Sequence, residues 1–449
     1  MTLLDCTKNH EGGKLLFASQ GKTLTVDDIL SESSNLSQFR YGLCDKAVAL
    51  VFQSNIELAK WMIFLDGVVN RITIIPPDIS IENRASFLTL SGTETVLFDH
   101  DNQLTGFSSV YNINRLNIHN SADVPIPENL TTEWVVATSG TTGSPKLVKH
   151  DFNSLTNTVK KGNGTDNRWG LLYGLHRFAG IQVFLQALTS ANALVITEPE
   201  ETLSEKIKLL TRNRVNCLSA TPTLWRKILM LTESQDLKLS VITLGGEIVD
   251  SNILKALRQR FPLAKVRHIY ASTEAGTCFS VSDGLSGFPE SYLQGILPDV
   301  SLKISNLNTL LIKSKSKSSG YIGNDLSSDD GYIDTGDLIQ IRNNRCYFNG
   351  RENGSINVGG NKVQPEYVES VLMEFPGVCF ANVTAKESSI VGNLVQASIV
   401  IDVLIDGDKD FIIQLREYCK SRLEQFMIPM SIKIVDDIHL NDTGKLIRK

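Results

Sequence analysis

Cysteine is scarce and scattered in this chain of 449 residues. Its seven cysteines form no CxxC pair and show no spacing typical of metal ligands, and their odd number argues against a disulfide framework. We therefore expect reduced thiols and a cytoplasmic location.

Long apolar runs and long basic runs are also missing. No apolar stretch reaches the roughly 18 residues that a membrane-spanning helix needs, so we expect no integral membrane span. Met1 to Lys14 contains Asp5 and Glu11 rather than a basic segment leading into an apolar one, so we expect no signal peptide. The net charge of −5 and the lack of a basic run argue against nucleic acid as a partner.

Short β-branched runs are abundant and alternate with amphipathic stretches such as Asp250–Phe261. This alternation predicts an α/β fold with parallel-rich sheets and helices. The length favours two or more domains. The predicted strands are Val48–Val51, Ile72–Ile75, Val135–Thr138, Ala193–Thr197, Cys217–Ala220, Val241–Leu244 and Val266–Tyr270.

After Gly350 the pattern changes to that of a smaller α+β module. We place a domain boundary at Arg351 to Gly354. Before it, Lys313–Ser319 alternates lysine and serine, which is typical of a solvated loop or hairpin edge. The predicted elements of the module are helices near Pro365–Glu374 and Phe411–Gln425 and strands near Val378–Ala385 and Val395–Ile401.

The strongest motif is a loop rich in glycine and hydroxyl residues, Thr138-Ser-Gly-Thr-Thr-Gly-Ser-Pro-Lys146, directly after a predicted strand. Glycines allow close approach to an anion, amides and hydroxyls donate to phosphate oxygens, and Lys146 adds a positive charge. It is not a Walker loop, because Gly143 is followed by Ser-Pro-Lys. A flexible linker is the alternative, but it leaves the abutting strand and the terminal lysine unexplained.

Three candidate residues follow strand-like runs at similar positions, namely Gly140, Gly246 and Ser272. Ligands of parallel sheets bind beyond the carboxyl ends of the strands. We therefore expect these residues to converge on one crevice.

Five motifs, in order, resemble those of the adenylate-forming superfamily of AMP-binding enzymes. This superfamily includes acyl-CoA and aryl-CoA synthetases, firefly-type luciferases and the adenylation domains of peptide synthetases. The loop TSGTTGSPK resembles its phosphate loop, and the likeness spans roughly Trp134–Arg448. It implies an N-terminal AMP-binding domain over residues 1–350, a hinge at 351–354 and a small mobile C-terminal lid domain over 355–449.

The resemblance implies roles around the nucleotide. Gly245-Gly-Glu247 resembles the segment that packs against adenine, and Tyr270-Ala-Ser-Thr-Glu274 resembles YGxTE with alanine in place of glycine. Tyr270 would stack on adenine, Thr273 would bond the α-phosphate and Glu274 would bind Mg²⁺. Taken alone, Tyr270 would suit a core position and Glu274 a surface position. The implied nucleotide-binding residues are Thr138, Ser139, Gly140, Thr141, Thr142, Gly143, Lys146, Gly245, Gly246, Glu247, Tyr270, Ala271, Ser272, Asp337 and Arg351.

Tyr332-Ile-Asp-Thr-Gly-Asp337-Leu resembles the YRTGDL motif, with Asp334 in place of the usual arginine. Asp337 would accept hydrogen bonds from both ribose hydroxyls. The alternative is that Asp334 and Asp337 only cap a turn.

The segment after Gly350 resembles the hinge of the family. Arg351 would reach the ribose, and Asn353 would absorb the rotation of the small domain, because asparagine tolerates unusual backbone angles. Gly359 and Gly360 would let a pantetheine arm run close to the backbone in the thiolation state.

Asn441-Asp-Thr-Gly-Lys445 resembles the terminal PxTxxGK motif without its proline. Lys445 would contact the substrate carboxylate and the α-phosphate and offset charge in the transition state. With Thr273 and Glu274 it completes the expected catalytic residues. A lone lysine in a tail would otherwise be solvated.

His176 and Phe178 lie where acyl and aryl synthetases of this family often carry residues beside the acyl substrate. A structural role for His176 is the alternative. Amino-acid-activating relatives need an aspartate here, and none occurs between Leu171 and Ala187. An α-amino acid is therefore a less favoured substrate.

The resemblance implies ATP-dependent, Mg²⁺-dependent activation of a small carboxylic acid through an acyl-adenylate, followed by thioester formation. The acceptor is either CoA or the phosphopantetheine of an acyl carrier protein, and the sequence leaves both open. The departures at Ala271, Asp334 and Asn353 keep a catalytically silent nucleotide-binding relative as the alternative.

Overall fold

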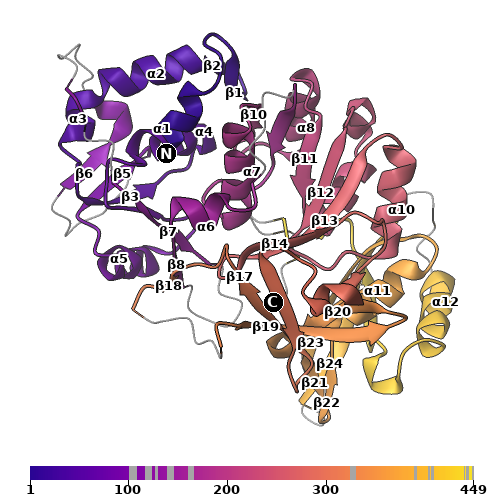
Figure 1. Ribbon diagram of the computed structural model, residues 1–449. Helices are drawn as coiled ribbons and strands as arrows, with labels where there is room; N and C mark the ends of the chain where they lie inside the picture. The colour runs from indigo at the N-terminus through magenta and orange to yellow at the C-terminus, as the bar shows by residue number, and fades with distance from the viewer. Residues whose placement is uncertain are drawn as a thin grey trace.

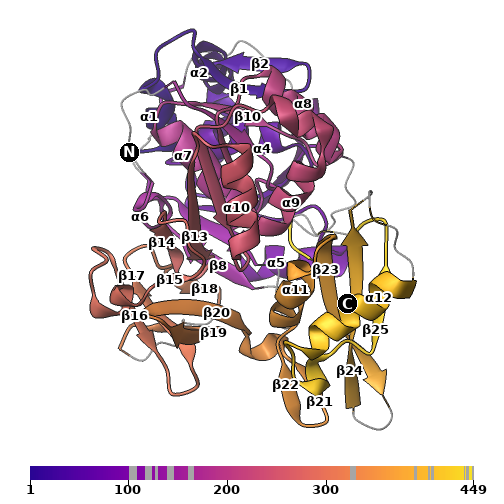
Figure 2. The same ribbon diagram turned by 90° about the vertical axis from the view of Figure 1, so that its right-hand side faces the viewer.

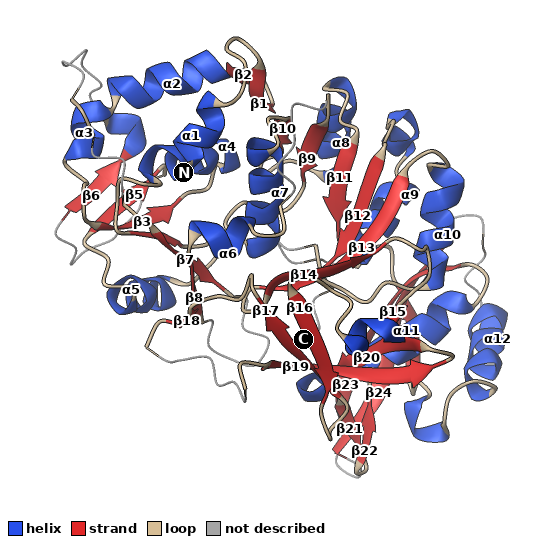
Figure 3. Ribbon diagram, in the orientation of Figure 1, coloured by secondary structure: helices blue, strands red, loops and turns tan. Residues whose placement is uncertain are grey.

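In the computed structural model, the chain folds into two large sheets with their helices, a third sheet and a C-terminal lobe (Figure 1, Figure 3). The described residues are 1–100, 109–116, 124–126, 130–138, 146–159, 166–323, 330–388, 392–402, 405, 409–438, 440 and 444–446. None of the helices within these ranges has the length and apolar character to cross a membrane.

One large sheet runs in the order β14-β13-β12-β11-β9-β10-β1-β2. The neighbours from β13 to β1 pair in parallel, whereas β14 and β2 pair antiparallel at the two edges. Its strands are β1 (Leu15–Ser19), β2 (Lys22–Thr25), β9 (Arg168–Leu171), β10 (Ala193–Ile196), β11 (Cys217–Ala220), β12 (Val241–Gly245), β13 (Lys265–Ser272) and β14 (Gly276–Val281).

The second large sheet runs in the order β18-β8-β7-β4-β3-β5-β6 and is parallel from β7 to β6. The antiparallel β8 is the strand that follows β7 in the chain, and the two strands pair with each other. Its strands are β3 (Ala47–Val51), β4 (Arg71–Ile74), β5 (Thr95–Phe98), β6 (Ser109–Asn112), β7 (Glu133–Ala137), β8 (Leu147–His150) and β18 (Gly320–Tyr321).

A layer of helices lies between the two large sheets. The helices α1 (Leu3–Lys8), α4 (Asn55–Leu65) and α7 (Phe178–Thr189) share one apolar core with both sheets. Every residue of α4 except Glu57 is buried, as expected for a helix covered on all sides. Thr221 and Asp250 cap two helices on the outer face of the first sheet. The other helices of this part of the chain are α2 (Val26–Asn35), α3 (Ser37–Tyr41), α5 (Ile81–Leu90), α6 (Phe152–Thr156), α8 (Leu203–Arg212), α9 (Pro222–Met230) and α10 (Ser251–Arg260).

The third sheet, β15-β20-β19-β17-β16, leads into the C-terminal lobe. That lobe has its own apolar core and lies beneath the large sheets in Figure 2. The third sheet contains β15 (Phe288–Pro289), β16 (Val300–Ile304), β17 (Thr309–Ser314), β19 (Ile333–Arg342) and β20 (Arg345–Arg351). The lobe contains β21 (Ile356–Val358), β22 (Asn361–Val363), α11 (Pro365–Glu374), β23 (Val378–Ser388), β24 (Gly392–Ile401), α12 (Lys409–Lys420) and β25 (Ser431–Ile434).

The predicted α/β class and the predicted strands agree with this architecture. Two predictions need correction. The last helix ends at Lys420 rather than at Gln425. The Lys313–Ser319 segment is not simply solvated: its lysines are exposed, but Ser314, Ser316 and Ser318 are buried. The alternation therefore marks a segment with one face packed against the protein.

Candidate active site

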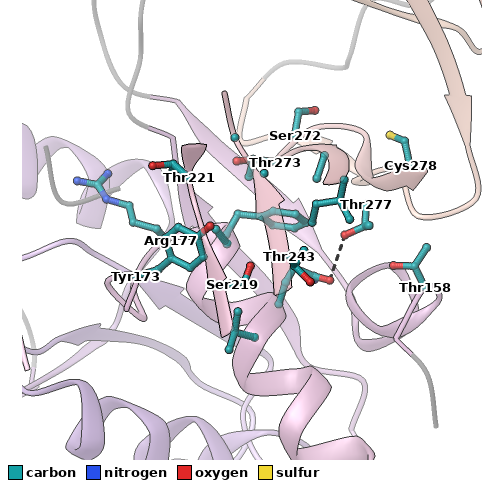
Figure 4. A pocket seen from close by; sticks show the side chains of 18 of the residues that line it. Thr158, Tyr173, Arg177, Ser219, Thr221, Thr243, Ser272, Thr273, Thr277 and Cys278 are labelled. Atoms are coloured by element: carbon teal, nitrogen blue, oxygen red, sulfur yellow. Dashed lines mark hydrogen bonds between the residues drawn. The ribbon is translucent and has the colours of Figure 1, made fainter. Parts of the chain in front are cut away.

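A cavity of about 490 Å³ lies at the carboxyl ends of β11, β12 and β13. The helix α7 covers one side, and Arg351 and Lys445 reach it from the C-terminal part of the chain. Figure 4 shows Thr221, Ser272 and Thr273 at one end of this site. The predicted convergence is therefore seen for Gly246 and Ser272, whereas Gly140 lies outside the described residues.

Thr138 and Lys146, the first and last residues of the predicted phosphate loop, are hydrogen-bonded to each other. The amide of Thr138 donates to the carbonyl oxygen of Lys146 over 2.8 Å, and the amide of Lys146 donates to the Thr138 hydroxyl over 3.2 Å. Both residues line the cavity. The remaining predicted loop residues, Ser139, Gly140, Thr141, Thr142 and Gly143, lie outside the described residues.

The turn after β13 places Thr273 and Glu274 in the cavity wall. Nε2 of His150 donates to the Thr273 carbonyl oxygen over 2.7 Å, and burial lowers the pKa of His150 to about 4. The Tyr321 hydroxyl donates to Glu274 over 3.2 Å, and Nζ of Lys146 lies 4.8 Å from the centre of the Tyr321 ring. These contacts hold one carboxylate close to the base of the loop.

The buried serine segment supports this turn from behind. The amide of Ser318 donates to the Glu274 carbonyl oxygen over 2.8 Å. Gly276 has a φ of +73°, and a Cβ there would lie 2.3 Å from the Ser316 carbonyl oxygen. Only glycine fits this close approach.

Tyr270, Asp337 and Arg351 form a second group of predicted residues. The Tyr270 hydroxyl donates to the Asp337 carboxylate, and Nε of Arg351 donates to the same carboxylate over 2.8 Å. The Tyr270 ring is stacked on Phe279 and on Phe348, at centroid distances of 5.4 and 5.1 Å. Stacking on adenine and bonding to ribose therefore stay predictions for this group.

Asp334 lies outside this group and fits the alternative of a turn cap. Its carboxylate accepts from the amide of Gly336 over 2.9 Å and from the Thr309 hydroxyl over 3.0 Å. This aspartate therefore stabilises the turn that precedes Asp337.

Three contacts anchor the end of the chain at the cavity. The Thr221 hydroxyl donates to the Gly444 carbonyl oxygen over 2.5 Å, and the Glu247 carboxylate accepts from the amide of Leu446 over 3.4 Å. Lys227 pairs with Asp437 over 2.7 Å. Together these contacts bring the residue between Gly444 and Leu446 into the site.

Lys445 itself lies against Gly246 and lines the cavity. Burial lowers the pKa of Lys445; the charge of Arg351 adds to this effect, and the carboxylate of Glu247 opposes it. A buried ammonium group of this kind interacts strongly with a nearby anion. The structure thus brings Lys445, Thr273 and Glu274 to one cavity.

Phe178, at the start of α7, also lines the cavity, and its ring is stacked on His150 at a centroid distance of 5.5 Å. His176 is not among the lining residues. Its ring is buried against Gly174, where a Cβ would lie 2.6 Å from Cε1 of the histidine. The role expected for His176 beside the acyl substrate stays a prediction.

The predicted hinge and thiol-tunnel residues are away from the cavity lining. Asn353 lies in the short 3₁₀ turn Glu352–Gly354 that follows β20. Gly359 and Gly360 form the tight turn between β21 and β22, with φ values of +57° and +93°. Their roles in a second conformation stay predictions.

The cavity lining also contains functional candidates outside the predicted site residues, Thr221 and Arg267, and His150 supports the Thr273 turn from outside the lining. Thr221 had a usable signal, because a threonine before Pro222 is typical of a helix N-terminus, here that of α9. The other two had none, since their sequence neighbourhoods match no motif.

Within the described residues there is no group of three or more histidine, cysteine or acidic side chains that could hold a metal. Mg²⁺ commonly uses only one or two protein carboxylates and takes its other ligands from phosphate and water. The single carboxylate of Glu274 in the cavity fits this mode.

The sequence profile of the AMP-binding enzymes matches residues 83–322, and that of the AMP-binding enzyme C-terminal domain matches residues 367–445. The chain belongs to the AMP-binding enzyme family, so the predicted family is confirmed.

Among known proteins, the chain is 25% identical over 343 residues to a 2-succinylbenzoate–CoA ligase of Bacillus subtilis, covering 71% of this chain and 68% of that protein. It is 25% identical over 354 residues to a D-alanine–D-alanyl carrier protein ligase of Staphylococcus aureus, covering 73% and 72%. The solved structure of the Bacillus subtilis o-succinylbenzoate CoA synthetase with its acyl-adenylate intermediate has a TM-score of 0.76 at 20% identity, covering 99% of this chain and 96% of that one. The predicted fold class is confirmed.

Proposed function

We propose that this protein is an ATP-dependent acid–thiol ligase that forms AMP. The observation that carries the proposal is that Lys445, held at the cavity by the contacts of Gly444 and Leu446, shares one wall with Thr273 and Glu274. A cation, a hydroxyl and a carboxylate at one place suit an enzyme that must handle a triphosphate and its metal ion. This arrangement argues against the alternative that the protein binds a nucleotide without catalysing a reaction.

In the first half-reaction, a carboxylate oxygen of the acid attacks the α-phosphorus of ATP, an acyl–phosphate bond forms and pyrophosphate leaves. Lys445 offsets the negative charge that grows on the α-phosphate, and Glu274 would hold Mg²⁺ against the phosphates. In the second half-reaction, a thiolate attacks the acyl carbon and AMP leaves. The protein needs no nucleophile of its own, because catalysis depends on positioning and charge compensation.

The thiol is that of CoA or of a carrier-protein phosphopantetheine. The names of the relatives include both a CoA ligase and a carrier-protein ligase, so they support either acceptor. We infer that the lobe after residue 354 rotates about the hinge at 351–354, which would bring Gly359 and Gly360 to the site and remove Lys445. A cytoplasmic location is part of the proposal and agrees with seven free cysteines.

The charges of the residues that line the cavity also indicate which class of acid is the substrate. Glu274 is the one acidic residue among the described residues that line it. An ammonium group on the substrate would find no carboxylate at the acyl end. We therefore propose an acid without an α-amino group.

ATP–pyrophosphate exchange across a panel of aliphatic, aromatic and amino acids tests the proposal. We expect acid-dependent exchange that requires Mg²⁺, followed by thioester formation when CoA or a phosphopantetheine-bearing carrier protein is added. Tight binding of ATP without exchange for any acid would contradict the ligase assignment.

A further inference from the structure

Arg267 places a positive charge on the floor of the cavity, away from the nucleotide end. It lies on β13 six residues before Thr273, which corresponds to about 20 Å along an extended strand. Alternation along β13 puts Arg267, Ile269 and Ala271 on the same face, and all three line the cavity. The guanidinium group therefore belongs to the acyl end of the site.

The neighbours of Arg267 across the sheet are neutral. In the register of the sheet, Ser219 pairs with Thr243, and Thr243 pairs with Arg267. Nε of Arg267 donates to the Thr243 hydroxyl over 3.1 Å. Figure 4 shows Ser219 and Thr243 in this row on the cavity floor. Burial raises the pKa of Cys217 to about 11, so the nearby thiol is also uncharged at neutral pH.

Other cations of the cavity wall have a charged or aromatic partner. Arg177 pairs with Asp78 over 2.9 Å and Arg351 with Asp337 over 2.8 Å. Lys146 lies over the ring of Tyr321. Within the described part of the chain, the only titratable group that acts electrostatically on Arg267 is Cys217, and no carboxylate does so.

Arg267 is partly buried, and a cation withdrawn from water without a counter-ion is unfavourable until a ligand supplies the opposite charge. Burial lowers the pKa of Arg267, yet an arginine stays protonated at neutral pH. A planar guanidinium group fits a carboxylate with two parallel hydrogen bonds. The residue thus has the chemistry of an anion-binding group inside a substrate cavity.

We propose that Arg267 binds a second carboxylate of the acid substrate, so that the enzyme activates one end of an extended dicarboxylic acid while the other end stays ionised at Arg267. This inference rests on the proposed ligase function. Gln182 and Gln186 on α7 also line the cavity and add neutral polar groups to it. The separation along β13 excludes short dicarboxylic acids such as malonic acid, which would not reach both ends.

The test compares each of three dicarboxylic acids, suberic, azelaic and 4-carboxycinnamic acid, with its own monomethyl ester, which keeps the length but removes one charge. ATP–pyrophosphate exchange gives kcat/KM, and calorimetry gives the binding of the acids themselves. We expect the wild-type enzyme to prefer at least one diacid over its half ester by about 100-fold. Arg267→Met should lower kcat/KM and binding for that diacid by about 100-fold and leave its half ester within threefold.

Two further variants serve as controls. Arg267→Lys retains the charge and should preserve part of the preference for the diacid. Lys265→Met removes an exposed charge from the same strand and should change neither acid. Unfolding midpoints and AMP binding establish that each variant is folded.

Equal use of diacid and half ester by the wild-type enzyme would overturn the inference, as would an equal loss for both in Arg267→Met. If acids with one carboxylate support exchange and none of the diacids does, only the role of Arg267 falls. If no acid of any class supports exchange, the ligase function falls with it.

Discussion

Lys445 and Gly246 are in direct contact although they lie almost two hundred positions apart. A Cβ on Gly246 would lie 3.1 Å from Cε and 3.6 Å from Nζ of Lys445. Gly246 also has a φ of +82°, which favours glycine. The loop after β12 therefore leaves space into which the terminal lysine fits.

Gly246→Ala should displace Lys445 and lower the adenylation rate by about tenfold or more, because small shifts of a catalytic group are costly. The backbone strain alone should destabilise the fold by roughly 1 to 2 kcal/mol. Gly295→Ala is the matched control, since Gly295 has a φ of +78° with nothing within 4 Å of its Cβ position. Chemical unfolding should report similar losses for both variants, and pyrophosphate exchange should fall only for Gly246→Ala. Equal exchange rates would show that the contact is unimportant.

Lys445→Ala should lower adenylation by about two to three powers of ten, the typical loss for one preorganised charge donor. Nucleotide affinity should change little, because Lys445 interacts mainly with charge that develops in the transition state. Exchange rates and AMP binding measure the two effects separately. Lys433→Ala removes an exposed lysine from β25 of the same lobe and serves as the control. An unchanged exchange rate in Lys445→Ala would refute the catalytic role.

Because of His150, the free energy of unfolding should decrease in mild acid. Its pKa of about 4 in the folded protein lies below the ordinary value of 6.5, so the unfolded chain binds more protons between these values. The stability contributed by neutral His150 is complete above pH 6.5 and is lost as the pH falls through this window. At pH 5 the loss is about 2 kcal/mol. Urea unfolding at pH 7.5 and 5.0 should show a smaller pH dependence, by about that amount, for His150→Gln, which keeps a donor for Thr273. The same pH dependence in both proteins would contradict this account.

Motifs predicted several residues at the proposed nucleotide end of the cavity, and fewer at the proposed acyl end. Thr273, Glu274 and Lys445 belong to sequence motifs whose residue types suit phosphate binding. All three line the cavity. The proposed acyl end contains strand residues such as Ser219 and Arg267, which lie in one row because of the register of the sheet. The register of the sheet cannot be predicted from a local sequence pattern.

The same limit applies to His176 and to the Lys313–Ser319 segment. His176 lies in a turn beside close backbone packing, because a Cβ on Gly180 would lie 2.3 Å from the Gly174 carbonyl oxygen. The Lys313–Ser319 alternation suggested solvent exposure, although its serines pack behind the Glu274 turn. In both cases tertiary packing decides where polar side chains point.

Asn353→Pro should separate the two half-reactions. Proline fixes φ near −65° and removes a backbone donor, so it should restrict rotation at the turn Glu352–Gly354. The conformation described above already has Lys445 at the cavity, so pyrophosphate exchange should stay within about threefold of wild type. Thioester formation needs the rotated lobe and should fall by at least tenfold, as measured by single-turnover transfer from a preformed acyl-adenylate. An equal loss in both half-reactions would place the hinge elsewhere, because a rigid turn at the true hinge obstructs only the step that requires movement.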